Sequence, residues 1–379
     1  MGRTRRILSV GHAYGVAGNR RLLHELARES CGRCEVVAVA PEFFHGDLRP
    51  VTLERDAAEP IRVLGVPLRG SRVVHLMAYG GALGRVLRQG WDLVHCFEEP
   101  YVLAGAQVAW ATPSRSRLVY FTAQNIAKRY PPPLSLFERL ALARASGWIG
   151  CGVTVGRALA DRPGYRDRAH RTIPYGVDVE AYRPDPEAGR SVRERLGWDG
   201  RRAVVGFLGR FVPAKGVELL TRVLDRLPQP WNLLLVGSGP LETALARWAA
   251  PHGARVRIVT DVRHEEVPAY LNAMDVVCVP SLTTRRWREQ FGRVLIEAFA
   301  CGVAVIGSDS GEVPHVIGDA GVVVGEADEA GWQASLGRLL DDAGARRDYA
   351  ERGRARAHAT YAWSAVARRH LQFFDELMG

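Results

Sequence analysis

The sequence predicts an α/β protein built from two doubly wound parallel sheets. Short apolar runs alternate with longer amphipathic segments, as expected for parallel strands joined by crossover helices. This alternation starts a second time at 202–209, after a stretch at 173–189 that is rich in Pro, Gly and acidic residues. A chain of 379 residues is long enough for two such domains.

The first half of the chain contains five runs with the length and composition of buried strands. Strands are expected at 5–11, 34–41, 92–97, 118–123 and 148–156. Helices are expected at 19–29 and 133–146, where the apolar residues share one face. Segment 71–90 is either an ordinary domain helix or an amphipathic helix for a lipid surface, and the ordinary helix is the commoner case.

The second half repeats the pattern and ends in helices. Strands are expected at 202–209, 232–239, 256–262, 276–281, 303–311 and 321–326. Helices are expected at 216–227, 265–275, 291–302, 333–357 and 363–378. We therefore predict a domain at 1–178 and another at 179–360, with a helix at 361–379 that packs back onto the first. Ligands of such domains bind at the carboxyl ends of the strands.

Composition excludes several classes of protein. No apolar run approaches the roughly 20 residues that span a bilayer. The basic N-terminus MGRTRRILSV is interpreted as a first strand rather than a signal peptide, so a cytoplasmic location is expected. Cys31 and Cys34 form a lone CxxC, for which free thiols are a better explanation than a zinc site.

The net charge of +10 is weak evidence for a nucleic-acid partner, because the arginines are dispersed among acidic residues. The chain has only two lysines, Lys128 and Lys215, and its preference for arginine is typical of a GC-rich genome. A lysine that this bias has not replaced is an informative position.

Residues 206–216, GFLGRFVPAKG, place Lys215 directly after a predicted strand. Arg210 offers a planar fork for phosphate oxygens, Lys215 adds a point charge, and Gly216 permits a close turn into the next helix. This combination suits a diphosphate. Taken alone, a pair of solvated loop charges would be the commoner explanation.

Residues 289–297, EQFGRVLIE, contain two glutamates around a predicted helix start. Glu289 would lie in the entering loop and Glu297 two turns into the helix. The amides of Phe291, Gly292 and Arg293 would form an anion site at the positive helix end. The alternative is that both glutamates are ordinary solvated side chains.

Together these motifs resemble those of the retaining glycosyltransferases of family 4, which have the GT-B fold. The resemblance rests on GFLGRFVPAKG, GSGP at 237–240, VPS at 279–281, IPYGVD at 173–178 and EQFGRVLIEAFACGVAVIGSDSGEVPHVI at 289–317. It covers the second half of the chain strongly and the first half more loosely.

The resemblance implies a donor site in the second domain. It implies that Arg210 and Lys215 bind the donor diphosphate, that Glu289 holds the sugar, and that Glu297 binds the nucleotide ribose. Val262 would meet the base through its backbone. The implied donor set is completed by Gly15, Gly237, Gln290, Phe291, Gly292, Arg293 and Val294.

The resemblance assigns the acceptor site to the first domain. The loop GHAYGVAGNRR at 11–21 resembles the family's glycine-containing loop, but GVAG replaces its usual paired glycines. His95 matches the family's His-containing segment. Gln124 stands where the family often has a histidine, and an amide cannot carry charge. The acceptor-binding candidates are His12, Tyr14, Glu98, Glu99 and Asn125.

The expected reaction transfers a hexose from a nucleotide-diphosphate sugar, most simply a UDP- or GDP-sugar, to an acceptor hydroxyl. The anomeric configuration is retained. No cofactor and no metal are expected. The catalytic candidates are Arg210, Lys215, Glu289, Gln124 and His95.

The acceptor stays open among a natural product, a lipid and a saccharide. Peripheral membrane contact is possible but not favoured, and no nucleic-acid partner is expected. A non-catalytic nucleotide-sugar-binding protein is the main alternative, because Gln124 lacks an imidazole. A GT-B epimerase or phosphorylase is a further alternative.

Overall fold

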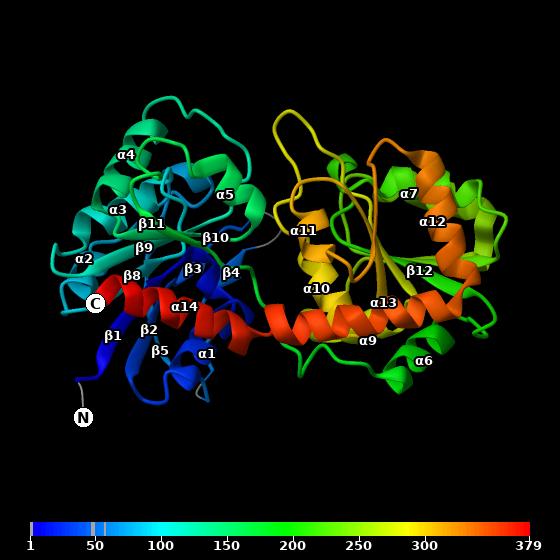
Figure 1. Cartoon of the computed structure of the whole chain (residues 1–379), viewed down its shortest axis with the longest axis horizontal. Helices are drawn as coiled ribbons and strands as arrows, with labels where there is room; N and C mark the ends of the chain where they lie inside the picture. The colour runs from blue at the N-terminus through cyan, green and yellow to red at the C-terminus, as the bar shows by residue number, and fades with distance from the viewer. Residues whose placement is uncertain (1–2, 47–49, 57) are drawn as a thin grey trace. The chain divides into compact units, whose positions relative to one another are not determined.

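The computed structural model describes residues 3–46, 50–56 and 58–379. The chain divides into two compact units, which we call unit 1 (Met1–Pro174 with Trp363–Gly379) and unit 2 (Tyr175–Ala362). Each unit is built on one parallel sheet with helices on both faces (Figure 1). The predicted α/β fold class with two parallel sheets is therefore confirmed.

The sheet of unit 1 has seven strands in the order β11-β10-β9-β8-β1-β2-β5. Its strands are β1 Arg5–Val10, β2 Cys34–Pro41, β5 Arg62–Val66, β8 Leu93–Cys96, β9 Arg117–Thr122, β10 Gly147–Gly150 and β11 Ala169–Thr172. From β1 the chain first adds β2 and β5 on one side. It then returns to add β8, β9, β10 and β11 on the other side, so the strand order reverses between β1 and β8. Ligands of doubly wound sheets bind at such a switch point, at the carboxyl ends of the strands.

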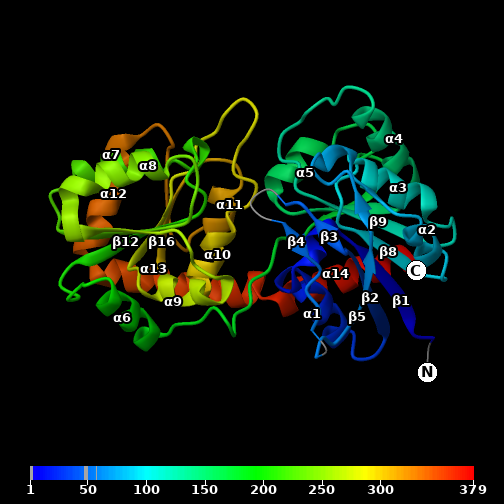
Figure 2. The same cartoon turned by 180° about the vertical axis from the view of Figure 1, so that it is seen from behind.

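The helices of unit 1 and two short hairpins complete this unit. The helices are α1 Arg21–Glu29, α2 Ala82–Leu87, α3 Leu103–Ala111, α4 Leu134–Arg144, α5 Val153–Leu159 and α14 Trp363–Met378. The hairpins pair β3 Phe43–Phe44 with β4 Val51–Thr52, and β6 Leu68–Arg69 with β7 Ala78–Tyr79. The last helix, α14, packs beside α1, as Figures 1 and 2 both show, and buries Val366, Phe373 and Phe374.

The sheet of unit 2 has six strands in the order β14-β13-β12-β15-β16-β17. Its strands are β12 Ala203–Leu208, β13 Trp231–Val236, β14 Val256–Val259, β15 Val276–Val279, β16 Ala304–Ser308 and β17 Val322–Val324. The order reverses between β12 and β15, which defines the switch point of this unit.

Both faces of the unit 2 sheet are buried. Along β13, Leu233 and Leu235 belong to one core cluster, whereas Leu234 and Val236 belong to the other, as the two-residue period of a strand requires. The helices are α6 Pro186–Arg195, α7 Val217–Asp225, α8 Glu242–Ala249, α9 Val267–Asn272, α10 Arg293–Ala300, α11 Val313–Ile317, α12 Glu329–Asp341 and α13 Ala343–Arg356. Helices α7, α8 and α12 cover one face, and α9, α10 and α13 lie on the other (Figure 2).

Several expected elements differ from those observed. The strand expected at 148–156 ends at Gly150, and α5 begins at Val153. The helix expected at 333–357 is two helices, because Asp342 interrupts it and caps α13 by accepting a hydrogen bond from the Ala345 amide. The sequence analysis did not predict the short strands β3, β4, β6 and β7, the sheet strands β5 and β11, or the helices α3, α5, α6, α8 and α11.

Segment 71–90 is not one amphipathic helix. It contains β7, which pairs antiparallel with β6, and the short helix α2. In the described part of the chain, no helix combines the length and the apolar character needed to cross a membrane.

Candidate active site

The switch point of unit 2 brings together two residues predicted from separate motifs. The loop after β12 carries Lys215, and the loop after β15 carries Glu289. Lys215 Nζ lies 2.6 Å from Glu289 Oε2, and the Ser281 hydroxyl donates to the same oxygen at 2.7 Å. Glu289 is buried and Lys215 is half-buried, so this ion pair fixes both loops at the sheet edge where ligands bind.

Glycines allow the backbones of these loops to approach closely. Gly216 has φ 68°, and a Cβ there would collide with the carbonyl oxygen of Pro280. Gly237, a predicted donor residue, has φ 142°, and a Cβ there would collide with the Gly209 carbonyl. Only glycine fits either position.

The start of α10 has the predicted form of an anion site. Gly292, in the left-handed conformation with φ 78°, is the residue before the helix, and as a glycine it provides no side-chain cap. The first amides of the helix therefore keep hydrogen-bonding capacity. Phe291 is buried against Tyr175 with ring centroids 5.3 Å apart, which fixes the entry of the chain into α10.

The remaining predicted donor residues differ in exposure. Arg210 is exposed at the end of β12, and its guanidinium forms no hydrogen bond or ion pair with any described residue. Glu297 Oε1 lies 3.9 Å from Arg293 Nη2. Burial raises the pKa of Glu297, and the charges of Arg293 and His264 offset part of that effect. Gln290 and Arg293 are exposed, whereas Val262 and Val294 are half-buried.

The switch point of unit 1 also holds an acid–base pair. His12 follows β1 and Glu98 follows β8, and the His12 Nδ1 to Glu98 Oε2 distance is 2.6 Å. The other oxygen, Glu98 Oε1, accepts from the His12 amide at 2.5 Å and from the Tyr79 hydroxyl at 2.6 Å. Burial favours the protonated form of Glu98, but the charge and hydrogen bonds of His12 and the hydrogen bond of Tyr79 outweigh it and lower the pKa.

The second glutamate, Glu99, enters a separate buried network. Its carboxylate accepts hydrogen bonds from the Ala123 amide, the Thr122 hydroxyl and the Gln124 side chain, at 2.8, 2.6 and 3.2 Å. Burial raises the pKa of Glu99, and these hydrogen bonds only partly offset it. Glu99 therefore differs from its neighbour Glu98 in the direction of its pKa shift.

Gln124 is a buried member of the same network. Its Nε2 donates to Glu99 and to the Tyr165 hydroxyl at 3.2 Å each, and its Oε1 accepts from the Tyr130 hydroxyl at 3.2 Å. The amide thus uses both its donor and its acceptor atoms within unit 1. Asn125, beside it, is also buried.

His95 lies in the core and not at the sheet edge. Its side chain is fully buried, Nδ1 lies 3.0 Å from Ser9 Oγ, and its ring centroid is 5.5 Å from that of Phe374 on α14. Burial lowers the pKa of His95 well below its usual value, and the charge of His370 adds to this effect. Within unit 1 His95 therefore packs in the core, and its catalytic role stays a prediction.

Two further predicted residues of unit 1, Tyr14 and Gly15, are both buried. The Tyr14 ring is buried and its hydroxyl lies 2.8 Å from Ser9 Oγ, so the ring packs against the sheet, and its acceptor-binding role stays a prediction. Gly15 has no positive φ, and a Cβ there would meet two side chains, Val51 at 3.3 Å and Pro41 at 3.8 Å.

Sequence analysis missed residues that complete both switch points. Ser281 lies within the VPS motif, so its position after a strand was a usable signal. Tyr79 was not predicted as a site residue because its segment, 71–90, was interpreted as a helix. Tyr130 and Tyr165, which bond Gln124, carry no motif that distinguishes them from core tyrosines.

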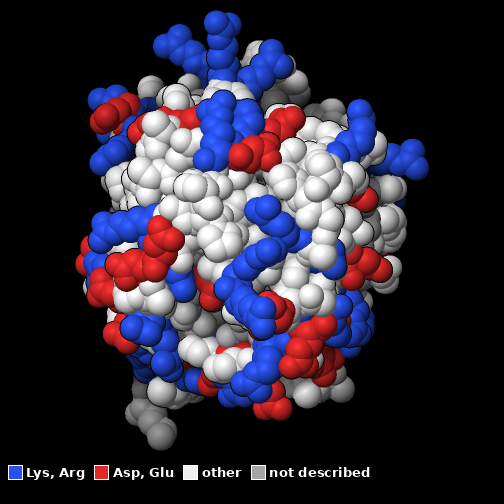
Figure 3. Space-filling model, turned by 90° about the vertical axis from the view of Figure 1, so that its right-hand side faces the viewer, with Lys and Arg blue, Asp and Glu red and all other residues white. Residues whose placement is uncertain are grey.

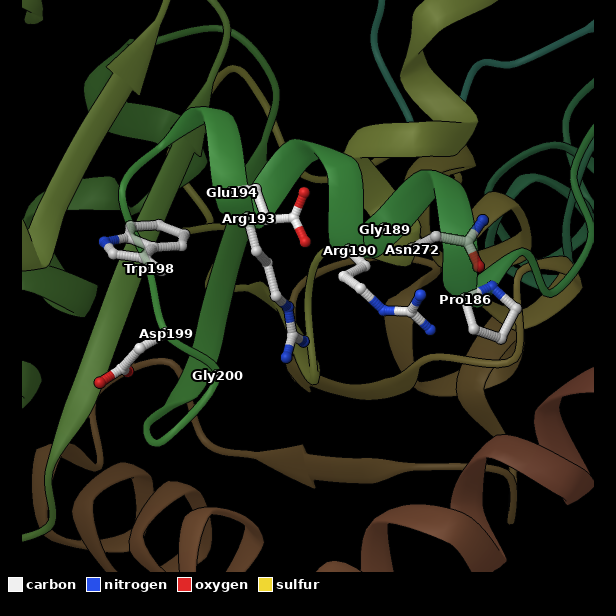
Figure 4. A pocket seen from close by; sticks show the side chains of 9 residues that line it. All are labelled: Pro186, Gly189, Arg190, Arg193, Glu194, Trp198, Asp199, Gly200 and Asn272. Atoms are coloured by element: carbon white, nitrogen blue, oxygen red, sulfur yellow. The ribbon is translucent and has the colours of Figure 1, made fainter.

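A surface pocket of about 540 Å³ lies elsewhere in unit 2, beside α6 (Figure 4). Its lining comes from α6, the following loop and the end of α9: Pro186, Gly189, Arg190, Arg193, Glu194, Trp198, Asp199, Gly200 and Asn272. None of the predicted site residues lines this pocket. Arg193 Nη2 forms an ion pair with Asp275 Oδ2 at 3.0 Å, so this side chain of the pocket wall is held by another residue of unit 2.

Comparisons with known proteins agree with this arrangement. Residues 190–356 match the family described as glycosyl transferases group 1. A D-inositol 3-phosphate glycosyltransferase of Salinispora arenicola is 30% identical over 319 residues, which cover 76% of this chain and 69% of that protein. The family resemblance drawn from the motifs is therefore confirmed.

Two other similar proteins extend the comparison. A GDP-mannose-dependent alpha-(1-6)-phosphatidylinositol monomannoside mannosyltransferase of Mycolicibacterium smegmatis is 37% identical over 179 residues, 45% of this chain and 47% of that protein. The chain thus spans only about half of this relative's length. The solved structure of a glycosyltransferase from Rickettsia africae ESF-5 has a TM-score of 0.78 at 14% identity and covers 100% of this chain and 99% of that one. This likeness confirms the GT-B fold.

Proposed function

Because this chain belongs to the glycosyl transferases group 1 family, we propose that it transfers a hexose from a nucleotide-diphosphate sugar to an acceptor hydroxyl, with retention of the anomeric configuration. The observation that carries this proposal is the Lys215–Glu289–Ser281 cluster at the switch point of unit 2. A cation and a carboxylate held together at a ligand-binding sheet edge suit a substrate that joins a diphosphate to a sugar.

In this proposal unit 2 binds the donor. Arg210, Lys215 and the first amides of α10 contact the diphosphate, and Glu289 contacts the sugar hydroxyls. Glu297 contacts the ribose, and Gly237 and Val262 lie near the nucleotide. Positive groups fixed before the reaction stabilise the charge that develops on the leaving diphosphate without reorganising.

Unit 1 binds the acceptor in this proposal. His12, Glu98, Glu99 and Asn125 lie at or beside the carboxyl ends of β1, β8 and β9, where polar groups can contact acceptor hydroxyls. Gln124 acts by fixing the Glu99 carboxylate. The acceptor oxygen forms the new bond to the anomeric carbon on the face that the diphosphate leaves, and its proton passes to the leaving phosphate.

The names of relatives guide the choice of substrates. One relative is described as GDP-mannose-dependent and acts on phosphatidylinositol monomannoside, and another is described as acting on D-inositol 3-phosphate. We therefore favour a GDP- or UDP-hexose as donor and an inositol-type polyol, free or lipid-linked, as acceptor. The free thiols of all six cysteines are consistent with the expected cytoplasmic location.

The test is a panel of UDP-, GDP-, ADP- and dTDP-sugars, with thermal stabilisation and release of free nucleotide as readouts. The expected result is one donor that stabilises the protein and releases nucleotide faster when an acceptor is added. Lys215→Met should lose both effects, whereas Arg247→Met, which removes an exposed cation elsewhere in unit 2, should retain them.

The alternative of a non-catalytic binding protein makes a different prediction. It predicts stabilisation by a nucleotide sugar without nucleotide release in the presence of any acceptor. An absence of stabilisation by every donor, in a folded protein, would contradict both hypotheses.

A further inference from the structure

We propose that the loop Thr283–Arg288 binds a phosphate group carried by the acceptor, so that this enzyme acts on phosphorylated acceptors. This inference rests on the proposed function and names the substrate class of the same site. The loop lies between β15 and α10, next to Glu289, and is the yellow segment ahead of α10 in Figure 1.

The loop has an ordered backbone. The Thr284 hydroxyl accepts hydrogen bonds from the amides of Arg286 and Trp287 at 3.3 and 3.0 Å. The Thr284 amide donates to the Trp287 carbonyl at 2.7 Å, which closes the turn. At its start, the Thr283 hydroxyl lies 2.9 Å from Ser310 Oγ, and the Thr283 amide donates to Glu326.

This turn presents three positive charges within four residues. Arg285 and Arg286 are exposed and Arg288 is half-buried, and none of the three side chains forms an ion pair or hydrogen bond with residues 3–46, 50–56 or 58–379. Some exposed arginines of unit 2 are neutralised, such as Arg222 and Arg226, which both pair with Glu329, whereas Arg190 and Arg210 are unpaired among the described residues but do not lie in a run of arginines. On the face shown in Figure 3, positive and negative side chains are interspersed over most of the surface.

The loop is continuous with the ion pair of unit 2. Lys215 Nζ lies 5.1 Å from the centre of the Trp287 ring, and the same Nζ pairs with Glu289. Arg288 directly precedes Glu289 in the chain. The loop therefore adjoins the ion pair that is proposed to hold the donor sugar, both along the chain at Arg288 and through the Trp287 ring.

The chemistry of the loop favours phosphate. A guanidinium binds phosphate oxygens through two parallel hydrogen bonds, and three guanidinium groups can share a dianion. A neutral sugar would leave these mutually repelling charges without a partner. Arg210, Lys215 and the α10 amides already provide for the donor diphosphate, so the loop is available for a second anion.

The experiment compares the triple variant Arg285→Ala, Arg286→Ala, Arg288→Ala with the wild-type protein. Calorimetry measures the binding of inositol 1-phosphate and of myo-inositol to the full chain saturated with the preferred nucleotide diphosphate. The wild type should bind the phosphorylated polyol at least about tenfold more tightly, since hydrogen bonds to charged groups contribute that much or more. The triple variant should lose this preference and keep its nucleotide affinity.

A matched control removes three other exposed arginines of unit 2, with Arg190→Ala, Arg247→Ala and Arg347→Ala. This variant has the same net charge as the loop variant and should keep the phosphate preference. Vesicles of phosphatidylinositol in phosphatidylcholine, compared with phosphatidylcholine alone, form the second arm. Loop-dependent binding to the phosphatidylinositol vesicles assigns the phosphate to a lipid headgroup, and loop-dependent binding only to inositol 1-phosphate assigns it to a free phosphate ester.

Three results would overturn the inference. The wild type shows no preference for phosphate in either arm, the loop variant keeps the preference, or the loop variant loses nucleotide affinity as strongly as phosphate affinity. Failure of the proposed function is distinguishable, because the wild type would then bind no nucleotide and release none from any donor.

Discussion

Each unit joins two loops across the switch point of its sheet by an acid–base pair, but the two pairs are supported differently. In unit 2 the Lys215–Glu289 pair lies among loops whose backbones touch at Gly216 and Gly237, where no side chain fits. In unit 1 the His12–Glu98 pair is supported by the Tyr79 side chain. The corresponding glycine, Gly15, has ordinary backbone geometry.

This difference explains which part of the sequence carries the recognisable motifs of the family. A site made by backbone contact requires glycine at fixed positions, so its pattern can be recognised from one chain. A site made by side-chain networks can be built from several residue combinations. The family match accordingly covers 190–356, which lies entirely within unit 2.

The largest expected effect comes from breaking the pair of unit 2. Glu289→Gln should lower kcat/KM by about a hundredfold or more, because it removes a fixed charge at the reacting centre. Glu98→Gln, which breaks the pair of unit 1, should lower it by about tenfold. Steady-state kinetics on folded variants measures both. Equal losses would mean that the two pairs contribute alike and that our distinction is wrong.

The next effect tests the backbone contacts. Gly216→Ala should reduce the free energy of unfolding by about 3 kcal/mol or more, since the new Cβ overlaps the Pro280 carbonyl. Gly15→Ala should change it by less than about 1 kcal/mol. Urea unfolding measures both variants.

The control for this comparison is Gly200→Ala. Gly200 has φ 76° but no atom within 4 Å of a new Cβ, so the variant isolates the cost of the positive φ, about 1–2 kcal/mol. If Gly216→Ala costs no more than Gly200→Ala, the close approach at Pro280 is not what requires glycine.

A smaller effect concerns the pH dependence of unit 1. The pKa of Glu98 is lower in the folded protein than its usual value, so its charged form adds stability above the unfolded pKa, near 4.3. That stability is lost as pH falls through the folded pKa. Glu98→Gln should therefore be destabilised by about 1–3 kcal/mol at pH 6 and approach the wild type near pH 3. A difference that does not change with pH would contradict this account.

The smallest effect is expected at the pocket beside α6. Arg190 is exposed there, and its side chain has no hydrogen-bond or ion-pair partner among the described residues. Arg190→Ala should change stability by less than about 0.5 kcal/mol and leave kcat/KM unaltered. A clear loss of activity would place a functional site outside both switch points.

The sequence signals for the loops at the switch point of unit 2 are local. The strand before Arg210, the glycines around Lys215 and the helix start at Gly292 each lie within a few residues of the group they position. Parallel strands then bring these loops to one sheet edge without further information. The contact between Lys215 and Glu289 follows from strand order, which the alternation of elements largely determines.

The unit 1 site could not be predicted to the same depth, because its contacts are distant in sequence. His95 occupies an apolar run that is equally compatible with a sheet edge and with a core. Helix α14, from the last residues of the chain, buries it. Tyr79 lies in a segment with helical spacing, but pairing of β7 with β6 overrides that spacing.

The position of α14 also reverses the order in which the two units can be completed during synthesis. Unit 1 begins first, but its α1 face and His95 remain uncovered until residues 363–379 leave the ribosome. Unit 2 is continuous and can close its own core before that happens. The nascent chain therefore carries an incomplete first domain throughout translation of the second, with the apolar face of α1 uncovered for that time.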